Sequence, residues 1–130
     1  MRSARRRWRQ AGAVTAELVI ATPLLLLLIS LIVQYVLFEH AEHVAQSAAE
    51  EAVTVTRLQG GTIASGRQQG EAVLNTLDNG LLVNPVITIT RTGTEARVEV
   101  SGYADQLVPF LRLSIDTVAV APVEPPSGGP

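Results

Sequence analysis

The chain of 130 residues contains no cysteine and no lysine, and aromatic residues make up only 4% of it. Without cysteine, the protein has no disulfide bond, no thiolate nucleophile and no cysteine-ligated zinc site. With so few aromatic side chains, and with its acids gathered beyond the first dozen residues, it has no stacking platform for nucleic acid. Its stability therefore depends on apolar packing or on neighbouring subunits.

Signatures of catalysis are missing as well. The sequence has no phosphate-binding glycine loop, no G-x-S-x-G elbow and no H-E-x-x-H motif. Glu99, Asp105 and Asp116 are isolated acids, which we interpret as solvated. The sequence therefore predicts that the protein is not an enzyme and has no cofactor and no small-molecule substrate.

Two closely spaced histidines raise the question of a metal-binding site. His40 and His43 are three residues apart, with Glu39 and Glu42 beside them, and this spacing can place two imidazoles on one side of a helix. The sequence shows no third ligand. We interpret both histidines as solvated residues just beyond the long apolar segment of the chain, and we expect no metal site.

Charge is absent from one long segment. Between Leu18 and Phe38 the clearly polar residues are Thr22, Ser30 and Gln34, and none is charged. A helix needs roughly 20 apolar residues to cross about 30 Å of hydrocarbon. The sequence therefore predicts a single membrane span at about 18–38, with the lipid bilayer as its first partner.

The remaining charge is distributed asymmetrically around this span. Five arginines and no acid precede Gly12, whereas five arginines and all twelve acids follow it. Basic residues next to a span stay on the cytoplasmic side. Residues 1–12 are therefore predicted to form a basic cytoplasmic leader, and everything from Glu39 onward is predicted to be extracytoplasmic.

A secretory signal peptide explains this pattern less well. The apolar run is too long for a signal h-region, and Glu39, His40 and Glu42 follow it in place of a small-residue cleavage site. Proteolytic cleavage before the span fits the sequence better than cleavage after it. Cleavage after Gly12 makes Ala13 the new N-terminus and Glu17 the fifth residue of the mature chain.

This arrangement of basic leader, Gly12, Glu17 and long apolar run resembles that of type IV prepilins and pseudopilins. The stretch ELVIATP and its following leucines resemble the TadE-like family of pilus-assembly proteins. Leu18 stands where major Flp pilins have Tyr, which favours a minor subunit. The resemblance implies a minor pilin or pseudopilin of a Tad/Flp pilus in the bacterial inner membrane, which either enters the filament, primes it or stays in the membrane. It also implies the partners: a prepilin peptidase, an inner-membrane platform with its ATPase, the major pilin and other pseudopilins.

Glu17 lies just inside the apolar run, where a carboxylate is costly: about 2.5–3.5 kcal/mol at the centre of a span, and less near the interface. Cleavage after Gly12 creates a positive amine at Ala13 that can pair with Glu17 of a neighbouring chain and set the subunit register. Three alternatives stay open. Glu17 is solvated at the headgroups without a role, it relays protons in a transport complex, or the chain is an uncleaved anchor carrying an extracytoplasmic binding module.

Pro23 interrupts the hydrogen bonds of the span. It lacks an N–H donor and clashes with the preceding turn, so we expect a helix kink over Val19–Pro23. Such a weak point can let the helix stretch or melt locally during assembly, or it is a passive bend.

The helix is predicted to continue beyond the membrane, because no stop follows Phe38. Small or apolar residues recur there at the spacing of one helix face, namely Ala41, Val44, Ala45, Ala48, Ala52 and Val55. Gly60-Gly61 ends the pattern. We therefore expect one continuous helix over 13–58.

A small α+β domain is predicted for residues 59–121. A short helix, weakened by Gly70, begins at the capping-box spacing of Ser65–Gln68 and ends at Asn79-Gly80. Three antiparallel strands follow, at Val86–Arg91, Ala96–Tyr103 and Leu113–Ala121, the last with an irregularity before Val118 and Val120. Residues 122–130 are rich in Pro and Gly and are predicted to be disordered. The predicted architecture resembles a reduced pilin, a long helix packed on a small sheet.

Overall fold

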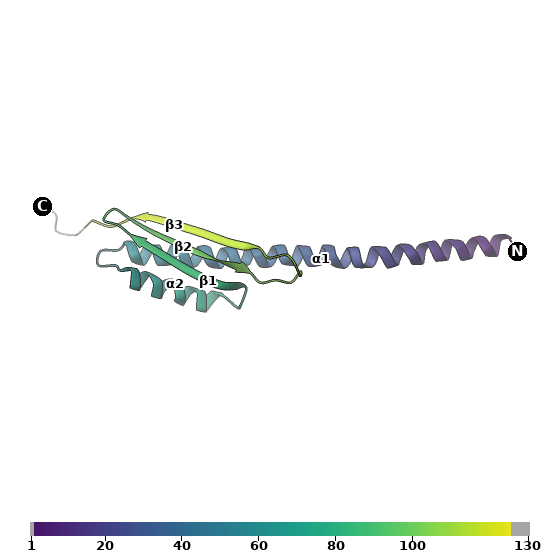
Figure 1. Cartoon of the computed structure of the whole chain (residues 1–130), viewed down its shortest axis with the longest axis horizontal. Helices are drawn as coiled ribbons and strands as arrows, with labels where there is room; N and C mark the ends of the chain where they lie inside the picture. The colour runs from purple at the N-terminus through teal and green to yellow at the C-terminus, as the bar shows by residue number, and fades with distance from the viewer. Residues whose placement is uncertain (1, 126–130) are drawn as a thin grey trace. The chain divides into compact units, whose positions relative to one another are not determined.

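The structure, a computed structural model, describes the backbone of residues 2–125 and the side chains from Gly12 onward. Its elements are α1 (Arg2–Arg57), α2 (Ile63–Leu77), β1 (Leu82–Arg91), β2 (Glu95–Ala104) and β3 (Ser114–Pro122) (Figure 1). They form two compact units, Met1–Val33 and Gln34–Pro130. The predicted class, a long helix followed by a short helix and a three-stranded antiparallel sheet, is confirmed.

The first unit consists of the N-terminal part of α1. The helix begins at Arg2, so the backbone of the expected leader, as far as it is described, is continuous with the helix. Every side chain from Ala13 to Ile29 is exposed, including the run of leucines after Pro23. Apolar residues that are exposed all around a helix are typical of a segment surrounded by lipid. By length and composition, α1 is able to cross a membrane.

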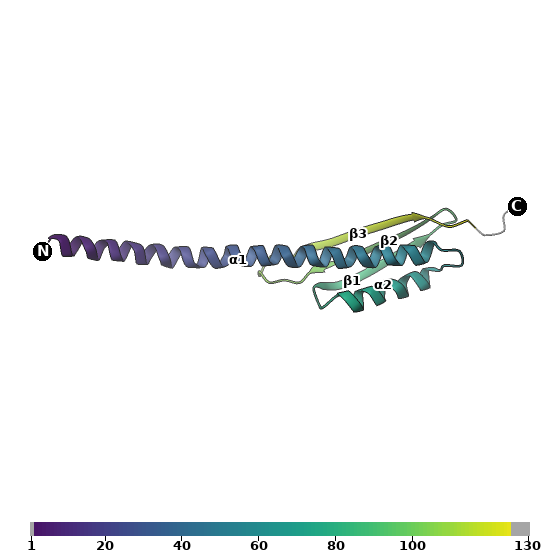
Figure 2. The same ribbon diagram turned by 180° about the vertical axis from the view of Figure 1, so that it is seen from behind.

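The second unit packs the C-terminal part of α1 against one face of the sheet, with α2 beside it on the same face (Figures 1 and 2). The predicted face of α1 is the buried one: Ala41, Val44, Ala45, Ala48 and Ala52 are all at most 3% exposed. Small side chains on this face let the neighbouring backbones approach closely. Val55, predicted to belong to the same face, is only half-buried.

The three strands form an antiparallel meander in the order β1-β2-β3. Residues 92–94 join β1 to β2. On β1, Ile87 and Ile89 face the helices, and they pair directly with Val100 and Val98 of β2. The alternation of buried and exposed residues, expected from the period of two, is therefore present on both strands of this hairpin. A bulge between Val83 and Val86 shifts the register before the hairpin becomes regular.

The predicted irregularity in the third strand is wrong. The pairing of β2 with β3 has no register shift. Thr117 pairs with Val100, and Ala119 pairs with Val98. Because directly paired residues point to the same face of a sheet, Thr117 and Ala119 are buried and the neighbouring valines of β3 are exposed. The buried Thr117 hydroxyl donates a hydrogen bond to the Val100 carbonyl at 3.4 Å and is therefore not left unpaired.

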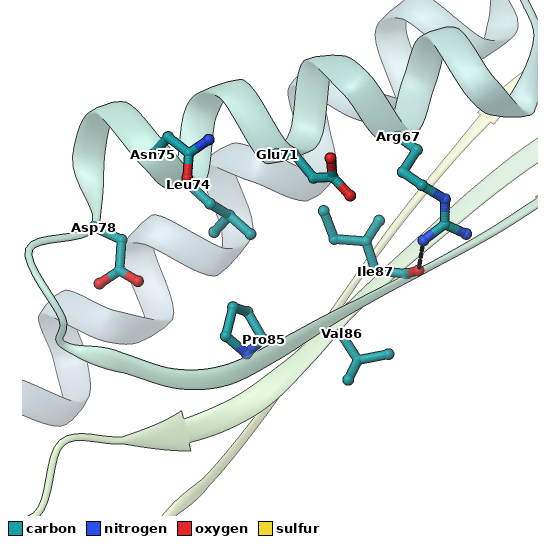
Figure 3. Close-up of a pocket in the computed structure, with 8 residues that line it drawn as sticks. All are labelled: Arg67, Glu71, Leu74, Asn75, Asp78, Pro85, Val86 and Ile87. Carbon is teal, nitrogen blue, oxygen red and sulfur yellow. Dashed lines mark hydrogen bonds between the residues drawn. The ribbon is translucent and has the colours of Figure 1, made fainter.

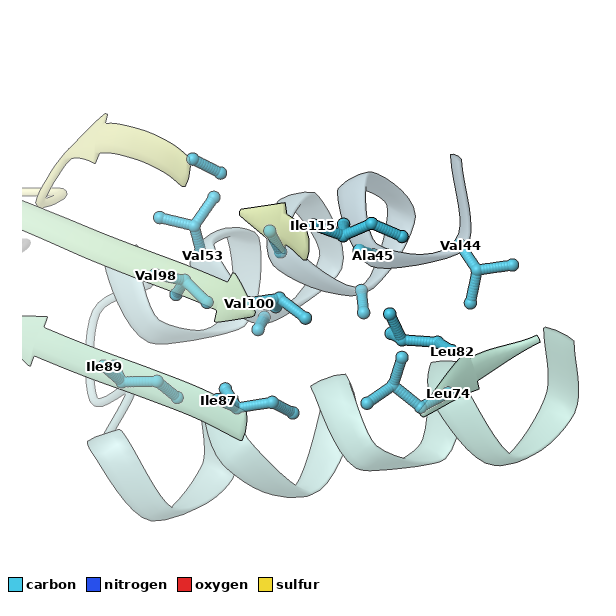
Figure 4. Packing of buried hydrophobic residues seen from close by; sticks show 14 of the residues in the cluster. Val44, Ala45, Val53, Leu74, Leu82, Ile87, Ile89, Val98, Val100 and Ile115 are labelled. Atoms are coloured by element: carbon cyan, nitrogen blue, oxygen red, sulfur yellow. The ribbon is translucent and has the colours of Figure 1, made fainter. Parts of the chain in front are cut away.

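The core of the second unit is built almost wholly of aliphatic residues. Figure 4 shows Val98 and Val100 at its centre, with Leu74 of α2 and Val53 of α1 on either side. Val98 and Val100 are completely buried. Since the chain has no disulfide, this contact of two helices with one sheet face is what stabilises the domain.

The N-cap of the second helix lies three residues before the predicted one, and the helix itself begins at Ile63. Its N-cap is Thr62, whose hydroxyl accepts from the Ser65 N–H at 3.0 Å, while Ser65 Oγ accepts from the Thr62 N–H at 2.9 Å. Ser65 is thus the third helical residue of a capping box and not its first member. The helix ends at Leu77, two residues before the predicted Asn79-Gly80.

Two arginine side chains form hydrogen bonds between the C-terminal end of α1 and the sheet. Arg91 Nε donates to the Thr56 carbonyl at 2.9 Å, and Arg57 Nε donates to the Pro122 carbonyl at 3.1 Å. The Glu124 N–H donates to the Arg57 carbonyl at 2.9 Å. The first residues of the expected tail, 122–124, thus take part in β3 or in backbone hydrogen bonds, and 126–130 lie outside the described residues.

Candidate functional site

The predicted processing site lies on an exposed, helical part of α1. Gly12 has helical backbone, and a Cβ built on it meets no atom within 4 Å. Glycine in the middle of a helix costs about 1 kcal/mol relative to alanine. Among the described residues, packing therefore gives no reason for glycine at this position.

Ala13 and Glu17 are separated by one turn of the same helix. Both are exposed, and residues four apart on a helix lie on the same face. Their separation along the axis is about 6 Å at 1.5 Å per residue. An amine at Ala13 and the Glu17 carboxylate would thus form one exposed pair of opposite charges, accessible to a neighbouring chain.

Pro23 lies within the helix, which continues without interruption on both sides of it. It is exposed, as are the apolar residues around it. The missing N–H leaves the Val19 carbonyl without its usual helical donor. The kink expected over Val19–Pro23 stays a prediction.

A polar site that the sequence did not indicate lies at Gln34. Its side chain is completely buried, although it belongs to the apolar run. Its Nε2 donates to the Asp105 carbonyl at 2.9 Å, and its Oε1 accepts from the N–H groups of Leu107 at 2.7 Å and Val108 at 3.1 Å. Gln34 therefore fixes the loop between β2 and β3 to α1.

The histidines and acids considered from the sequence do not converge. His40 and His43 are both exposed on α1. Among the described residues, no group of three or more His, Cys, Asp or Glu side chains could hold a metal ion. Glu99 is half-buried on β2, and Asp105 and Asp116 are exposed.

A surface pocket of about 480 Å³ lies between α2 and β1 (Figure 3). Arg67 closes one end by donating from Nη1 to the Ile87 carbonyl at 2.9 Å. The other polar groups lining it are carboxylates and one amide, from Glu71, Asn75 and Asp78. Its lining offers no histidine, hydroxyl or thiol.

An exposed apolar helix that passes without interruption into a small α+β domain has the organisation of a single-pass membrane-anchored protein. Residues 12–54 match the family model described as TadE-like protein, which confirms the resemblance seen in the sequence. The TadE-like family is a pilus-associated structural family and not an enzyme family. No curated protein and no solved structure matches the chain.

Two features of the second unit were missed by sequence reasoning. One is Gln34, which was noted only as a polar interruption of the apolar run. A polar group at membrane depth needs a hydrogen-bond partner. The position of Gln34 within the apolar run could therefore have indicated a contact with another part of the chain. The other is the pair Gly66 and Gly70, whose spacing of four places both glycines on the face of α2 that meets Ala52 of α1.

Proposed function

We propose that this protein is a minor pilin or pseudopilin of a Tad/Flp pilus, cleaved by a prepilin peptidase between Gly12 and Ala13, with Glu17 setting the subunit register. The main support is the extent of the family match, which begins at Gly12 and includes Glu17, Pro23 and the whole apolar run. The exposed position of Gly12, with open space around it, agrees with recognition by an enzyme rather than with a packing role.

In this function the second unit stands on the extracytoplasmic side of the inner membrane, and α1 provides both the anchor and the assembly interface. Cleavage removes the five leader arginines and creates a positive amine one helical turn from Glu17. Glu17 of one subunit then attracts the amine of another, and a misaligned neighbour leaves both charges unpaired in an apolar environment. The major pilin, other pseudopilins and the assembly platform with its ATPase are the proposed partners.

The mass of the chain tests the processing step. Co-expression with the prepilin peptidase should remove residues 1–12, and Gly12→Ala should abolish this loss. Gly93→Ala is the matched control, because a Cβ at Gly93 also meets no atom within 4 Å. It should be processed like the natural chain. An unshortened natural chain beside an active peptidase would refute cleavage and favour the alternative of an uncleaved anchor with a binding module.

A further inference from the structure

The loop between β2 and β3 carries an uninterrupted apolar sequence on its surface. From residue 107 to residue 111 it reads Leu-Val-Pro-Phe-Leu, with no polar side chain. Leu107 is 50% exposed, and Phe110 is completely exposed. Phe110 also has a φ of 76°, a left-handed conformation that bulky residues rarely adopt and that Gly or Asn adopts more easily. In a turn that faces water, an exposed phenylalanine in this conformation adds no stability to the fold.

The position of this loop along α1 is fixed by Gln34. Its three hydrogen bonds join the loop backbone at Asp105, Leu107 and Val108 to the helix, and Figure 1 shows the loop lying beside α1. Gln34 belongs to the same unit as the loop. The loop therefore lies level with the last apolar turn before Glu39, the first acid after the run.

The length of the span places this level within the bilayer. Leu18 to Val33 is 16 residues, which is about 24 Å of helix and too short for about 30 Å of hydrocarbon. The helix must continue apolar through the Gln34–Phe38 turn to cross. In this turn Gln34 is buried by the loop, whereas Tyr35 and Val36 are 62% and 58% exposed, as expected of side chains that face lipid or its headgroups.

Much of the loop backbone is hydrogen-bonded within the protein, from Ala104 to Val108 and again at Leu111, whose N–H donates to the Val108 carbonyl at 3.2 Å. The N–H groups of Ala104 and Asp105 donate to the Leu113 and Leu81 carbonyls, and that of Gln106 donates to the Asp105 carboxylate. The next two N–H groups donate to Gln34, and Pro109 has none. Irregular backbone is tolerated at membrane depth only where its polar groups are satisfied by protein.

We propose that the β2–β3 loop inserts Leu107 and Phe110 into the interfacial layer of the bilayer that α1 crosses, with Gln34 as the residue that positions it. Arg112 marks the polar side of this layer. It is exposed, stacks on the Tyr103 ring with 3.9 Å between its guanidinium carbon and the ring centroid, and can reach lipid phosphates. The inference rests on the membrane anchoring within the proposed function, and it requires neither cleavage nor pilus assembly.

The absence of cysteine permits a direct test by site-directed spin labelling. The full chain carrying Phe110→Cys, or Leu107→Cys to retain the phenylalanine, would be labelled and reconstituted in vesicles of phosphatidylethanolamine and phosphatidylglycerol. Leu26→Cys, within the apolar run, is the positive control. Val120→Cys, half-exposed at the far end of β3, is the matched aqueous control.

The expected result is that labels at 107 and 110 collide severalfold more with oxygen than with a water-soluble nickel chelate, as at position 26 and unlike position 120. Labels at 107 and 110 that behave like position 120, while position 26 lies in lipid, would overturn the inference and leave the anchor intact. If position 26 is also aqueous, the anchoring itself fails and the inference fails with it.

Gln34→Leu tests the positioning role. Removing the amide leaves the Leu107 and Val108 N–H groups without an acceptor, so the loop should move toward water and the oxygen preference at position 110 should fall. An unchanged profile would refute the role of Gln34. Ser30→Ala is the control, since Ser30 Oγ donates only to the Leu26 carbonyl of its own helix and its removal should change nothing in the loop.

Discussion

At the scale of single residues, the informative positions of α1 are those whose chemistry the fold does not require. Gly12 has open space where a side chain could stand. Glu17 is a carboxylate exposed on a helix that is otherwise suited to lipid. Both residues lower the stability of an isolated membrane helix, glycine through its conformational entropy and glutamate through its charge. In the proposed function their use comes from other proteins, a peptidase for Gly12 and a neighbouring subunit for Glu17.

Glu17→Gln tests the register role. The neutral amide should still allow membrane insertion and cleavage, because it lowers the insertion cost and leaves Gly12 intact. A hydrogen bond between charged groups contributes about 1.5–3 kcal/mol, so recovery in filaments should fall by about 10- to 100-fold. Quantitative immunoblotting of sheared filaments and membranes measures this ratio.

Thr22→Val is the control for that measurement, because it changes another exposed polar residue of the same span. It should partition as the natural chain does. If Glu17→Gln enters filaments as well as Thr22→Val does, Glu17 does not set the register. A failure of export with normal assembly of the exported fraction would instead favour a role of Glu17 in proton relay or in membrane insertion.

At the scale of elements, the contact between α1 and α2 depends on small residues on both helices. A Cβ added at Gly66 would collide with the buried Thr56 hydroxyl and lie 3.1 Å from the Ala52 carbonyl oxygen. One added at Gly70 would lie 3.2 Å from the Ala52 Cβ and 3.1 Å from Ile87 Cδ1. Gly70, expected from propensity to weaken α2, is therefore, with Gly66, one of two residues that let this helix pack closely on α1.

Gly66→Ala should destabilise the second unit by about 1–3 kcal/mol, because the added methyl overpacks the helix contact. Gln68→Ala, an exposed substitution on the same helix, should change stability by less than about 0.5 kcal/mol. Chemical unfolding of the full chain in detergent, followed by circular dichroism, measures both.

A double-mutant cycle identifies the cause of that loss. Thr56→Ala removes the hydroxyl that the new methyl would meet, so the double variant should recover part of the stability, with a coupling of about 0.5–3 kcal/mol. Strictly additive effects would show that the Thr56 contact is not what makes glycine necessary at position 66.

The elements also show where sequence reasoning succeeds. The long face of α1 and the hairpin were predictable, because a helical or twofold period repeated over many residues has few alternative interpretations. The third strand itself was predictable, but its regular register was not, because the buried Thr117 and Ala119 are less apolar than the exposed Val118 and Val120. The pairing of β3 with Val100 and Val98 decides which face of the strand is buried. That pairing depends on the tertiary fold and cannot be read from the sequence of β3 alone.

At the scale of the whole molecule, the residues proposed for processing and assembly could be named from the sequence because they lie within one short stretch, Gly12 to Pro23, and their roles stay predictions. Gln34 could not be named in this way, because its partners are 71 to 74 residues away in the chain. Only the fold brings the β2–β3 loop to this residue, and with it the apolar surface of the loop.

The arginine distribution predicts a cytoplasmic N-terminus and an extracytoplasmic second unit. In peptidase-deficient cells, where the leader is retained, Gly93→Cys should react with an impermeant maleimide in intact spheroplasts. Ser3→Cys should react only after permeabilisation. The natural chain provides a blank, since it contains no thiol. The reverse labelling pattern would place the domain in the cytoplasm and exclude a role in an external filament.

The most direct test of the whole account is the intact mass of this chain in sheared pili and in membranes from piliated cells. We predict a species that begins at Ala13 and lacks residues 1–12, present in the membrane and recovered with the filament or its assembly complex. A chain that retains residues 1–12 in every fraction of cells with an active prepilin peptidase would contradict the account.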